Sequence, residues 1–596
     1  MKISTKSFIS CALALGMTMS AGAVSDPTLA WGKLFDGTTA AGDNNTAIAI
    51  GTDNTVYWYN TLGSTDAARD LYFGGEKIFE GAPYTGTSNN GNFALTKTDA
   101  QGNALWTVYS NSGDFASSQG NLAVDEDGSI IFTAKVRHTD GHLDSPVTFV
   151  DATGTATQVG TAIEGSRYYF LILGKISADG ELLWTRTIEP ARTIGDDSLT
   201  DAVTTSSVVL AGGNIFIGGS FARELTFEKT GNTTATISSV STADWTKSGT
   251  ERDLYIAKFD TDGYFTAALT NTGNKMKTVN VLSIDADNDV LYVNGVITAL
   301  SDGETTATLG DKTLNAGTFN SCFTTAVNPA DLSVNWASSL TNAGVDGKGD
   351  YQNASINVVG DNVWIAAMGN GTFTCAEDQT KTFTTVTGNT REGFLIKYDR
   401  QGNLMGATTS RADYSTTGLT GYLNTFENPR LPGKVYVFGY TMTGAPGVFI
   451  RAYDAETLTS DESTAWNIIT GGGVPTGQAA VFNSDEPAAY VAARGNKAFV
   501  PMGGEESAAP EKWAIYAARF NMPDSFLSSI SSVATQPDLT VTGAHGMLTA
   551  ASSQPCTVNV FDITGRLVAS LNVNGTASVA LPAGIYIAAG HKVAVR

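Results

Sequence analysis

Five aspartates recur at one place in the sequence, each in a short turn that precedes an apolar, strand-like run. The turns are AGDNNT (41–46), SGDFAS (112–117), IGDDSL (194–199), KGDYQN (348–353) and RADYST (411–416), and the aspartates are Asp43, Asp114, Asp196, Asp350 and Asp413. Carboxylates gathered around one point would bind a hard cation such as calcium, or accept hydrogen bonds from sugar hydroxyls. Each aspartate could instead cap its own turn. The pattern predicts a candidate ligand-binding ring, with calcium left open and no other cofactor expected.

Histidine chemistry has one candidate location outside the C-terminal tail. The loop RHTDGHLDSP (137–146) holds His138, Asp140, His142 and Asp144, which could ligate a metal. Their alternate spacing in a polar loop is more typical of a solvated segment, and no Gly-x-Ser-x-Gly motif accompanies the histidines. Hydrolysis through two of the recurring aspartates stays open, because it needs two suitably spaced carboxyl groups. The sequence assigns no catalytic residue and favours a protein that is not an enzyme.

Repeated hairpins are the elements that must position these residues. One type has an apolar strand, a basic residue, an Asp-containing turn and a strand that often bears Trp, at 93–115, 170–190, 254–271, 322–342, 394–410, 448–468 and, truncated, 513–525. A tight-turn type precedes each copy, at 47–60, 121–136, 207–221, 281–296, 355–369, 425–440 and 490–504. Two hairpins make four strands, so the repeats predict an all-β fold, a seven-bladed β-propeller.

The two ends of this repeat array complete each other. WGKLF (31–35) resembles the last strand of a unit, whereas the seventh unit ends at RFNMPDS without one. An N-terminal strand beside the segment near Ile515 would close the ring and remove an exposed sheet edge. Long polar segments at 61–91 and 224–253 join second and third strands, and we expect them to form loops or added hairpins on the ligand-binding face.

The repeated Asp-containing turn has a physical explanation. Its glycine can adopt the positive φ of a tight turn, and its aspartate can accept hydrogen bonds from turn amides. The glycines are Gly102, Gly180, Gly263 and Gly402, and the aspartates are Asp99, Asp260 and Asp399. Tryptophans on the outermost strands are expected to pack between blades rather than stack on carbohydrate; they are Trp31, Trp106, Trp184, Trp336 and Trp466.

Charge, cysteines and the N-terminus narrow the class of protein. The net charge of −22 opposes binding to nucleic acid or to anionic membranes. Lys2 and Lys6, an apolar run and small residues at 21–23 predict a signal peptide over 1–23, and no later stretch is apolar enough to span a membrane. Beyond that peptide, Cys322, Cys375 and Cys556 are too far apart in sequence to indicate a disulfide framework or a zinc site.

The repeat units resemble a known family. SGDFASSQGNLAVDEDGSIIFTAKV (112–136) and GDYQNASINVVGDNVWIAAMG (349–369) are similar to units of the secreted bacterial beta-propeller-repeat proteins. The resemblance covers about residues 31–525. It implies the fold and leaves the activity open.

The tail at 539–596 follows a Ser-rich linker at 528–538, and its alternating pattern predicts a small β-sandwich. VFDITGRLV (560–568), LPAGIYIA (581–588) and KVAVR (592–596) resemble the type A C-terminal sorting domain of Bacteroidota type IX secretion substrates. The resemblance implies export by that machinery, with the tail cleaved and the protein attached to the cell surface or released. The matching motif residues are Asp562, Gly565, Arg566, Gly584, Tyr586, Lys592 and Arg596. A plain adhesive β-module is the alternative.

These observations combine into one functional hypothesis. Residues 24–527 are expected to form the propeller of an exported protein that is secreted or held at the outer surface. Its loop-rich face would bind glycan or protein without catalysis, while the tail engages the type IX machinery. A glycan-active hydrolase or lyase using axial carboxylates is the alternative, and a structural surface-layer component is a third reading.

Overall fold

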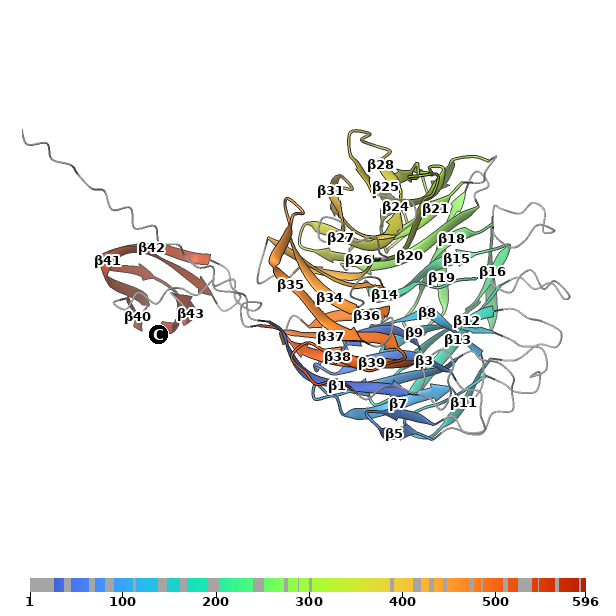
Figure 1. Ribbon diagram of the computed structural model, residues 1–596, viewed down its shortest axis with the longest axis horizontal. Helices are drawn as coiled ribbons and strands as arrows, with labels where there is room; N and C mark the ends of the chain where they lie inside the picture. Colours follow the sequence, from blue (N-terminus) through green and yellow to red (C-terminus); the bar gives the residue numbers. More distant parts are fainter. Residues whose placement is uncertain are drawn as a thin grey trace, which may run out of the picture.

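The architecture is all-β (Figure 1). The structure is a computed structural model that describes residues 26–36, 44–63, 70–80, 91–110, 114–137, 147–160, 169–190, 203–239, 251–272, 277–287, 289–299, 303–385, 391–410, 420–427, 433–442, 447–471, 476–483, 486–507, 513–523, 539–544, 546–562, 567–588 and 591–595. Within these ranges no helix is long and apolar enough to cross a membrane.

The predicted tight-turn hairpins are present as antiparallel strand pairs. They are β2 (Asn44–Ile50) with β3 (Val56–Gly63), β8 (Asp114–Val124) with β9 (Ile130–Arg137), β14 (Ser207–Ala211) with β15 (Asn214–Phe221), β20 (Thr278–Ala286) with β21 (Leu291–Thr298), β26 (Asp350–Val359) with β27 (Asn362–Asn370), β32 (Thr420–Glu427) with β33 (Lys434–Thr441), and β36 (Thr476–Asn483) with β37 (Ala488–Gly495).

The hairpins with the Asp-containing turn follow in the same way. They are β6 (Gly91–Thr98) with β7 (Ala104–Ser110), β12 (Tyr169–Ile176) with β13 (Leu182–Pro190), β18 (Asp253–Phe259) with β19 (Phe265–Thr272), β24 (Phe319–Val327) with β25 (Val334–Asn342), β30 (Glu392–Asp399) with β31 (Leu404–Thr409), and β34 (Gly447–Asp454) with β35 (Ser460–Gly471).

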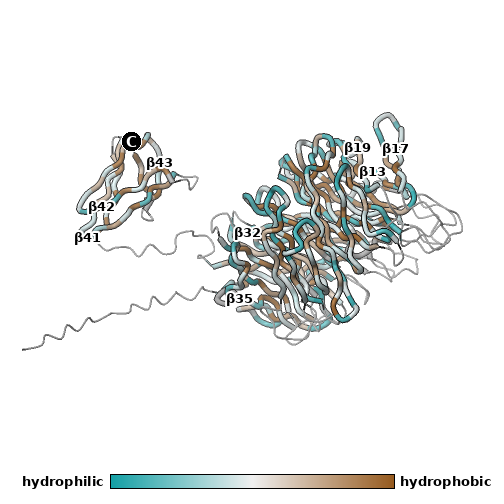
Figure 2. The backbone as a smooth tube through the Cα atoms, turned by 90° about the horizontal axis from the view of Figure 1, so that it is seen from above, coloured by the Kyte–Doolittle hydropathy of each residue, from teal (hydrophilic) through white to brown (hydrophobic). Residues whose placement is uncertain are grey.

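Each of the first six tight-turn hairpins pairs with the hairpin that follows it, so that four strands form one antiparallel ladder, named here by its first strand. A single pairing, Gly91 with Phe115, also joins the β2 ladder to the β8 ladder. Apolar side chains fill the space between neighbouring ladders; Phe93 of β6 lies 5.0 Å from Phe132 of β9, measured between ring centroids. Figure 2 shows hydrophobic stretches, in brown, alternating with more polar ones along the strands. The arrangement is consistent with a β-propeller.

The N-terminal strand lies where the sequence predicts it. β1 (Thr28–Asp36) pairs antiparallel with β39 (Ala514–Asn521), with Trp31 opposite Arg519 and Phe35 opposite Ile515. β39 in turn pairs with β37, so β1 is the fourth strand of the β36 ladder. The predicted contact between the segment around Trp31 and the strand near Ile515 is confirmed.

Additional strands extend most ladders at the outer edge. β4 (Leu71–Phe73) and β5 (Glu76–Phe79) continue from β1, β10 (Val147–Val150) and β11 (Ala156–Gly160) from β7, β16 (Glu224–Lys229) and β17 (Thr233–Ser238) from β13, β22 (Thr306–Leu309) and β23 (Lys312–Asn315) from β19, β28 (Thr372–Cys375) and β29 (Thr382–Thr384) from β25, and β38 (Phe499–Pro501) from β35. Each comes from the ladder that follows. The described parts of the long segments 61–91 and 224–253 are therefore added hairpins that cover a neighbour's edge, not loops of a binding face.

On several of the fourth strands, a tryptophan side chain contacts the next ladder. Trp106 on β7 donates from Nε1 to the carbonyl of Ala178 at 3.0 Å, in the turn of the β8 ladder. In the same turn, Gly180 has φ +89°, and a Cβ placed on it would lie 2.9 Å from the Trp106 indole. The same relation links Trp31 with Gly102, Trp184 with Gly263 and Trp336 with Gly402. The predicted packing of these four tryptophans between ladders is confirmed.

The basic residue of the repeated hairpin contacts the same turn. Lys97 donates to the carbonyl of Ala178 at 3.2 Å, and Lys258 donates to that of Ala330 at 3.0 Å in the following ladder. Within the turn, Asp99 Oδ1 accepts hydrogen bonds from the backbone amides of Gln101 and Asn103, as predicted. The repeated lysine, aspartate, glycine and tryptophan are thus explained by the packing between ladders.

The C-terminal residues form a separate antiparallel sheet with its own apolar core. Its strands are β40 (Thr540–Ala544), β41 (Met547–Asp562), β42 (Leu567–Ala580), β43 (Gly584–Ala588) and β44 (His591–Val595). The long β41 pairs with β42 along one edge and with both β40 and β43 along the other. β40 also approaches β44, since a Cβ on Gly543 would lie 2.3 Å from the Ala594 carbonyl oxygen. The two-layer sandwich stays a prediction.

Candidate functional site

The proposed ring of aspartates falls mostly outside the described residues. Asp43, Asp196 and Asp413 lie there, as does the loop segment from His138 to Asp144. Asp114 begins β8, where its backbone pairs with Arg137. The ring stays a prediction, and Asp350 is the one member whose side chain is described.

Both carboxylate oxygens of Asp350 already have hydrogen-bond or ion-pair partners. Its Oδ1 accepts hydrogen bonds from Asn320 Nδ2 at 2.8 Å and from the Tyr351 backbone amide at 2.9 Å. Its Oδ2 accepts from Gln352 at 2.9 Å and forms an ion pair with Arg391 at 2.8 Å. These contacts tie β24, β26 and the start of β30 together. No cluster of three or more metal-ligating side chains is found within the described ranges.

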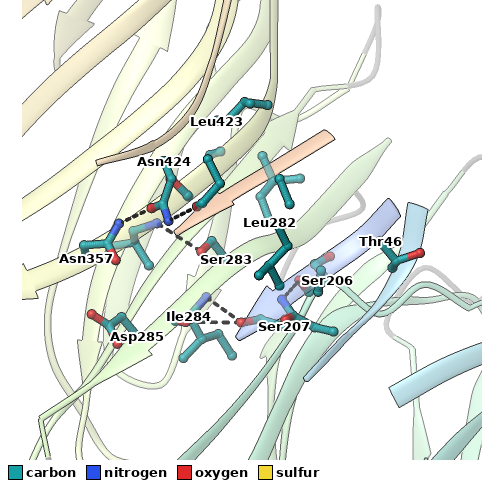
Figure 3. A pocket seen from close by; sticks show the side chains of 18 of the residues that line it. Thr46, Ser206, Ser207, Leu282, Ser283, Ile284, Asp285, Asn357, Leu423 and Asn424 are labelled. Carbon is teal, nitrogen blue, oxygen red and sulfur yellow. Dashed lines mark hydrogen bonds between the residues drawn. The ribbon is translucent and has the colours of Figure 1, made fainter. Parts of the chain in front are cut away.

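A cavity of about 690 Å³ lies where the first strands of the ladders converge. Its lining comes from β2, β8, β20, β26, β32 and β36, from β14 and the residues just before it, and from Met368 and Tyr440. Figure 3 shows side chains from several of these strands around it, with Thr46 and Asn357 on different sides. Amide and hydroxyl side chains dominate the polar part of the lining: Asn45, Thr46, Asn121, Thr204, Thr205, Ser206, Ser207, Asn280, Ser283, Ser355, Asn357 and Asn424.

Irregular pairing brings consecutive residues to this cavity. The register between β20 and β21 shifts between Val281 and Ser283, and that between β32 and β33 shifts between Tyr422 and Asn424. Similar shifts occur in β2, β8, β26 and β36. Such bulges bend a strand and re-aim its side chains. Adjacent residues such as Leu282 and Ser283 therefore both line the cavity.

Some of the polar lining is used to join the strands. Asn121 Nδ2 donates to the Ser206 carbonyl at 3.1 Å, and Ser206 Oγ donates to the Val281 carbonyl at 2.7 Å. Farther round, Asn357 Nδ2 donates to Asn424 Oδ1 at 2.6 Å. Each bond crosses from one ladder to the next, so these side chains are structural as well as part of the wall.

Other polar atoms of the lining have no hydrogen-bond partner among the described residues. Asn45 Oδ1, Thr46 Oγ1 and Ser355 Oγ are buried in this state. Asn45 is 2% exposed, and its Nδ2 already donates to Asn60 Oδ1 at 2.8 Å. A buried polar atom without a partner costs about 1–3 kcal/mol. These three oxygens are closed to solvent, so this cost is borne by the folded chain itself.

Asp285 is the carboxylate of the lining. Its Oδ2 accepts a hydrogen bond from the Val358 amide at 2.7 Å, across to β26, and its Oδ1 accepts from the Ala286 amide at 2.8 Å. Burial raises the pKa of Asp285 to about 6, and the nearby Asp287 adds to the rise. The group therefore changes charge in mildly acidic solution.

The sequence does not reveal this site, because its residues look like solvated strand positions. The signal that could have found them is an Asn or Ser that recurs on the first strand of the unit, in NNTAI, GNLAV, ASINVV and YLNTF. In an ordinary two-sided sheet such residues face water, whereas on the innermost strand of a ring they face the axis.

The residues of the sorting motif are only partly described. Gly565, Arg566 and Arg596 lie outside the described residues, and Lys592 is described only as part of β44. Tyr586 is buried and donates from its hydroxyl to the Pro582 carbonyl at 2.9 Å. Asp562 pairs with Tyr586 between β41 and β43, and Gly584 begins β43 opposite Val595. Asp562 and Gly584 thus help to place β43 in the sheet.

Comparisons with known proteins place the chain in no family. No family and no curated protein matches it. Among solved structures it is similar to a quinohaemoprotein alcohol dehydrogenase from Pseudomonas putida HK5, at 12% identity over 83% of this chain and 76% of that one, with a TM-score of 0.35. A chain from the Drosophila Plexin A complex with Semaphorin 1b gives 7% identity, coverages of 80% and 88%, and a TM-score of 0.30.

A further solved structure is PorZ, a bacterial surface component of the type IX secretion system of Porphyromonas gingivalis. Its identity is 9% over 94% of this chain and 98% of that one, with a TM-score of 0.20. At these identities and TM-scores, none of the three structures carries an argument about function.

Proposed function

We propose that this chain is an exported, non-catalytic binding protein built on a seven-bladed β-propeller, which β1 closes within the last blade. Residues 24–527 form the propeller, and its axis presents the ligand site. The observation that carries the proposal is the cavity between the innermost strands, with its neutral amide and hydroxyl lining. A small number of convergent polar groups in a concave site is typical of ligand recognition.

Glycan is the ligand class that fits the lining better than protein. Amides and hydroxyls can each donate and accept, as the hydroxyls of a sugar do. The net charge of −22 works against anionic ligands. Calcium binding by the five recurring aspartates is tested separately, by adding a chelator.

Hydrolysis or elimination of glycans is the second candidate, and one observation favours it. Asp285 lies in the cavity wall with a pKa raised to about 6, as suits a general acid. Both of its oxygens are held by backbone amides of the protein. Because hydrolysis uses a pair of carboxyl groups, the lining supports binding more strongly.

The experiment is an array of oligosaccharides and purified surface proteins probed with the mature chain, with and without chelator. Retention on glycan spots without cleavage supports binding. Release of sugar fragments that stops in Asp285→Asn supports the hydrolase instead.

Export and sorting form the second part of the proposal. Residues 1–23 direct the chain to the export machinery, and residues 539–596, after the linker 528–538, direct it through the type IX system to the outer surface or the medium. Truncation after Asp538 in a Bacteroidota host tests this assignment. The full chain should reach the cell surface or medium, and the truncated chain should stay in the periplasm.

A further inference from the structure

We infer that the axial cavity binds a nonionic amphiphile, a sugar that carries an apolar substituent, whose apolar part packs on Leu282, Leu423 and Val481. The inference rests on the proposed binding function and deepens it, because it gives the ligand a second, apolar part. It moves the site from the five recurring aspartates to the first strands of four neighbouring ladders.

One side of the cavity wall is apolar. The apolar side chains of the lining that stay partly exposed come from the β20, β26, β32 and β36 ladders, and they are Leu282, Ala354, Leu423, Ala479 and Val481. The first strands of these ladders lie in contact, β20 with β26, β26 with β32 and β32 with β36. By contrast, Ala47 and Ile48 of β2 and Val208 of β14 are buried. The exposed apolar surface is therefore gathered on four successive ladders.

Strand bulges turn the two leucines toward the cavity. Leu282 and Leu423 are each the residue that the pairing of its strand with the following strand skips, and a bulge re-aims the side chain it holds. Each packs in part against an apolar core and stays partly exposed. Figure 3 shows both side chains in the wall of the cavity. They offer apolar surface that a bound molecule can remove from water.

Two amide atoms of the lining can serve the polar part of the ligand. Asn280 accepts from Thr204 Oγ1 at 3.2 Å through its Oδ1, and its Nδ2 donates to none of the described residues. Asn357 donates from Nδ2 to Asn424 at 2.6 Å, and its Oδ1 accepts from none of them. Unlike the closed oxygens described above, Asn280 Nδ2 and Asn357 Oδ1 are open to solvent. Together they provide one donor and one acceptor for a hydroxyl-bearing head.

The charge of the ligand follows from the same wall. The lining contains neither lysine nor arginine within the described residues, so the carboxylate of a fatty acid would enter without a counter-charge. Asp285 offers little to a cationic head, because its two oxygens already accept hydrogen bonds from the Val358 and Ala286 amides. A nonionic head meets neither cost.

The cavity has room for both parts of such a molecule. Its volume of about 690 Å³ lies within the usual range of small-molecule sites. Each CH₂ group that leaves water for the apolar side should strengthen binding by about three- to fourfold.

Two variants place polar atoms on the apolar side. Leu423→Asn puts an amide among the apolar side chains, whereas Val481→Thr keeps the branched shape of valine and is the milder change for the fold. Urea unfolding shows which variants fold. Each folded variant should bind an alkyl-bearing sugar about three- to tenfold more weakly. The matched control is Leu105→Asn on the outer strand β7, where Leu105 is 52% exposed. It should bind like the unaltered protein.

The assay is isothermal titration calorimetry of the mature chain with methyl, butyl and octyl β-glucoside, below the concentrations at which micelles form. Affinity that rises from methyl to octyl, and loses that rise in each folded cavity variant but not in Leu105→Asn, supports the inference. Equal affinity for the three glucosides, or a rise that persists in a folded cavity variant, overturns it. Binding of none of them overturns it as well. The proposed glycan binding is decided separately, by the array of oligosaccharides.

Discussion

Gly180→Ala tests how the ladders are joined. Gly180 has φ +89°, and an added Cβ would lie 2.6 Å from the Ala152 Cβ and 2.9 Å from the Trp106 indole. Neither contact can yield easily, because Ala152 has no side-chain rotamers and the Trp106 Nε1 is bonded to the Ala178 carbonyl at 3.0 Å. Left-handed backbone costs an L-residue about 1–2 kcal/mol. Overpacking costs about 1–3 kcal/mol more. We expect a total loss of about 2–5 kcal/mol in the free energy of unfolding.

Gly154→Ala is the matched control, because Gly154 lies two residues from Ala152. Its φ is +82°, and an added Cβ would meet nothing within 4 Å. It should therefore show only the backbone cost, about 1–2 kcal/mol. Urea unfolding followed by tryptophan fluorescence measures both variants. Equal losses in Gly180→Ala and Gly154→Ala would refute the tight joint between Trp106 and the neighbouring turn.

Three further perturbations follow from the same contacts. In the folded protein the pKa of Asp285 is raised to about 6, against about 4 in the unfolded chain. Protonated Asp285 therefore favours the folded state. This contribution is complete below pH 4 and is lost as the pH rises to 6, which lowers the free energy of unfolding by about 3 kcal/mol. Urea midpoints at pH 4.5 and 7.5 should therefore differ less in Asp285→Asn than in the unaltered chain; an unchanged difference would contradict the burial of this group. Trp336→Phe removes the Nε1 hydrogen bond to the Arg400 carbonyl, 2.8 Å long, and should lower the free energy of unfolding by about 1 kcal/mol, measured by urea unfolding. Asn424→Ala removes a 2.9 Å hydrogen bond to the Ala480 carbonyl and the hydrogen bond from Asn357. It should lower the free energy of unfolding by about 1–3 kcal/mol, and a thermal midpoint of unfolding equal to that of the unaltered chain would contradict the role of these bonds in joining the ladders.

The hairpins could be predicted from sequence because their signals are local. A tight turn between two apolar runs and an aspartate–glycine turn both act within a few residues. The pairing of β1 with β39 was also predictable, since an unmatched strand at one end corresponded to a missing strand at the other. Recurrence supplied the long-range information that single strands lack.

The outer hairpins and the cavity could not be predicted in the same way. Strands such as β4 (Leu71–Phe73) are short, and the hairpin of β4 and β5 joins β1 of the preceding ladder rather than the four main strands of its own unit. Residues such as Ser355 are polar strand positions whose surroundings include residues of other ladders. The ion pair of Asp350, a candidate ligand-binding residue, could not be predicted, because the sequence separates it from Arg391 by 41 residues. In each case the deciding contact is between units.

The proposed closure of the propeller by β1 is tested most directly by engineering a disulfide between β1 and β39. Thr28 and Asn521 are exposed and directly opposite in the register, and antiparallel partners have Cα separations that suit a disulfide. The pair Thr28→Cys and Asn521→Cys, with Cys556→Ser to remove the partly exposed native thiol, would be oxidised and digested without reductant. We expect mass spectrometry to find the two segments linked within one molecule. Free thiols after oxidation, or links only between molecules, would contradict the closed ring.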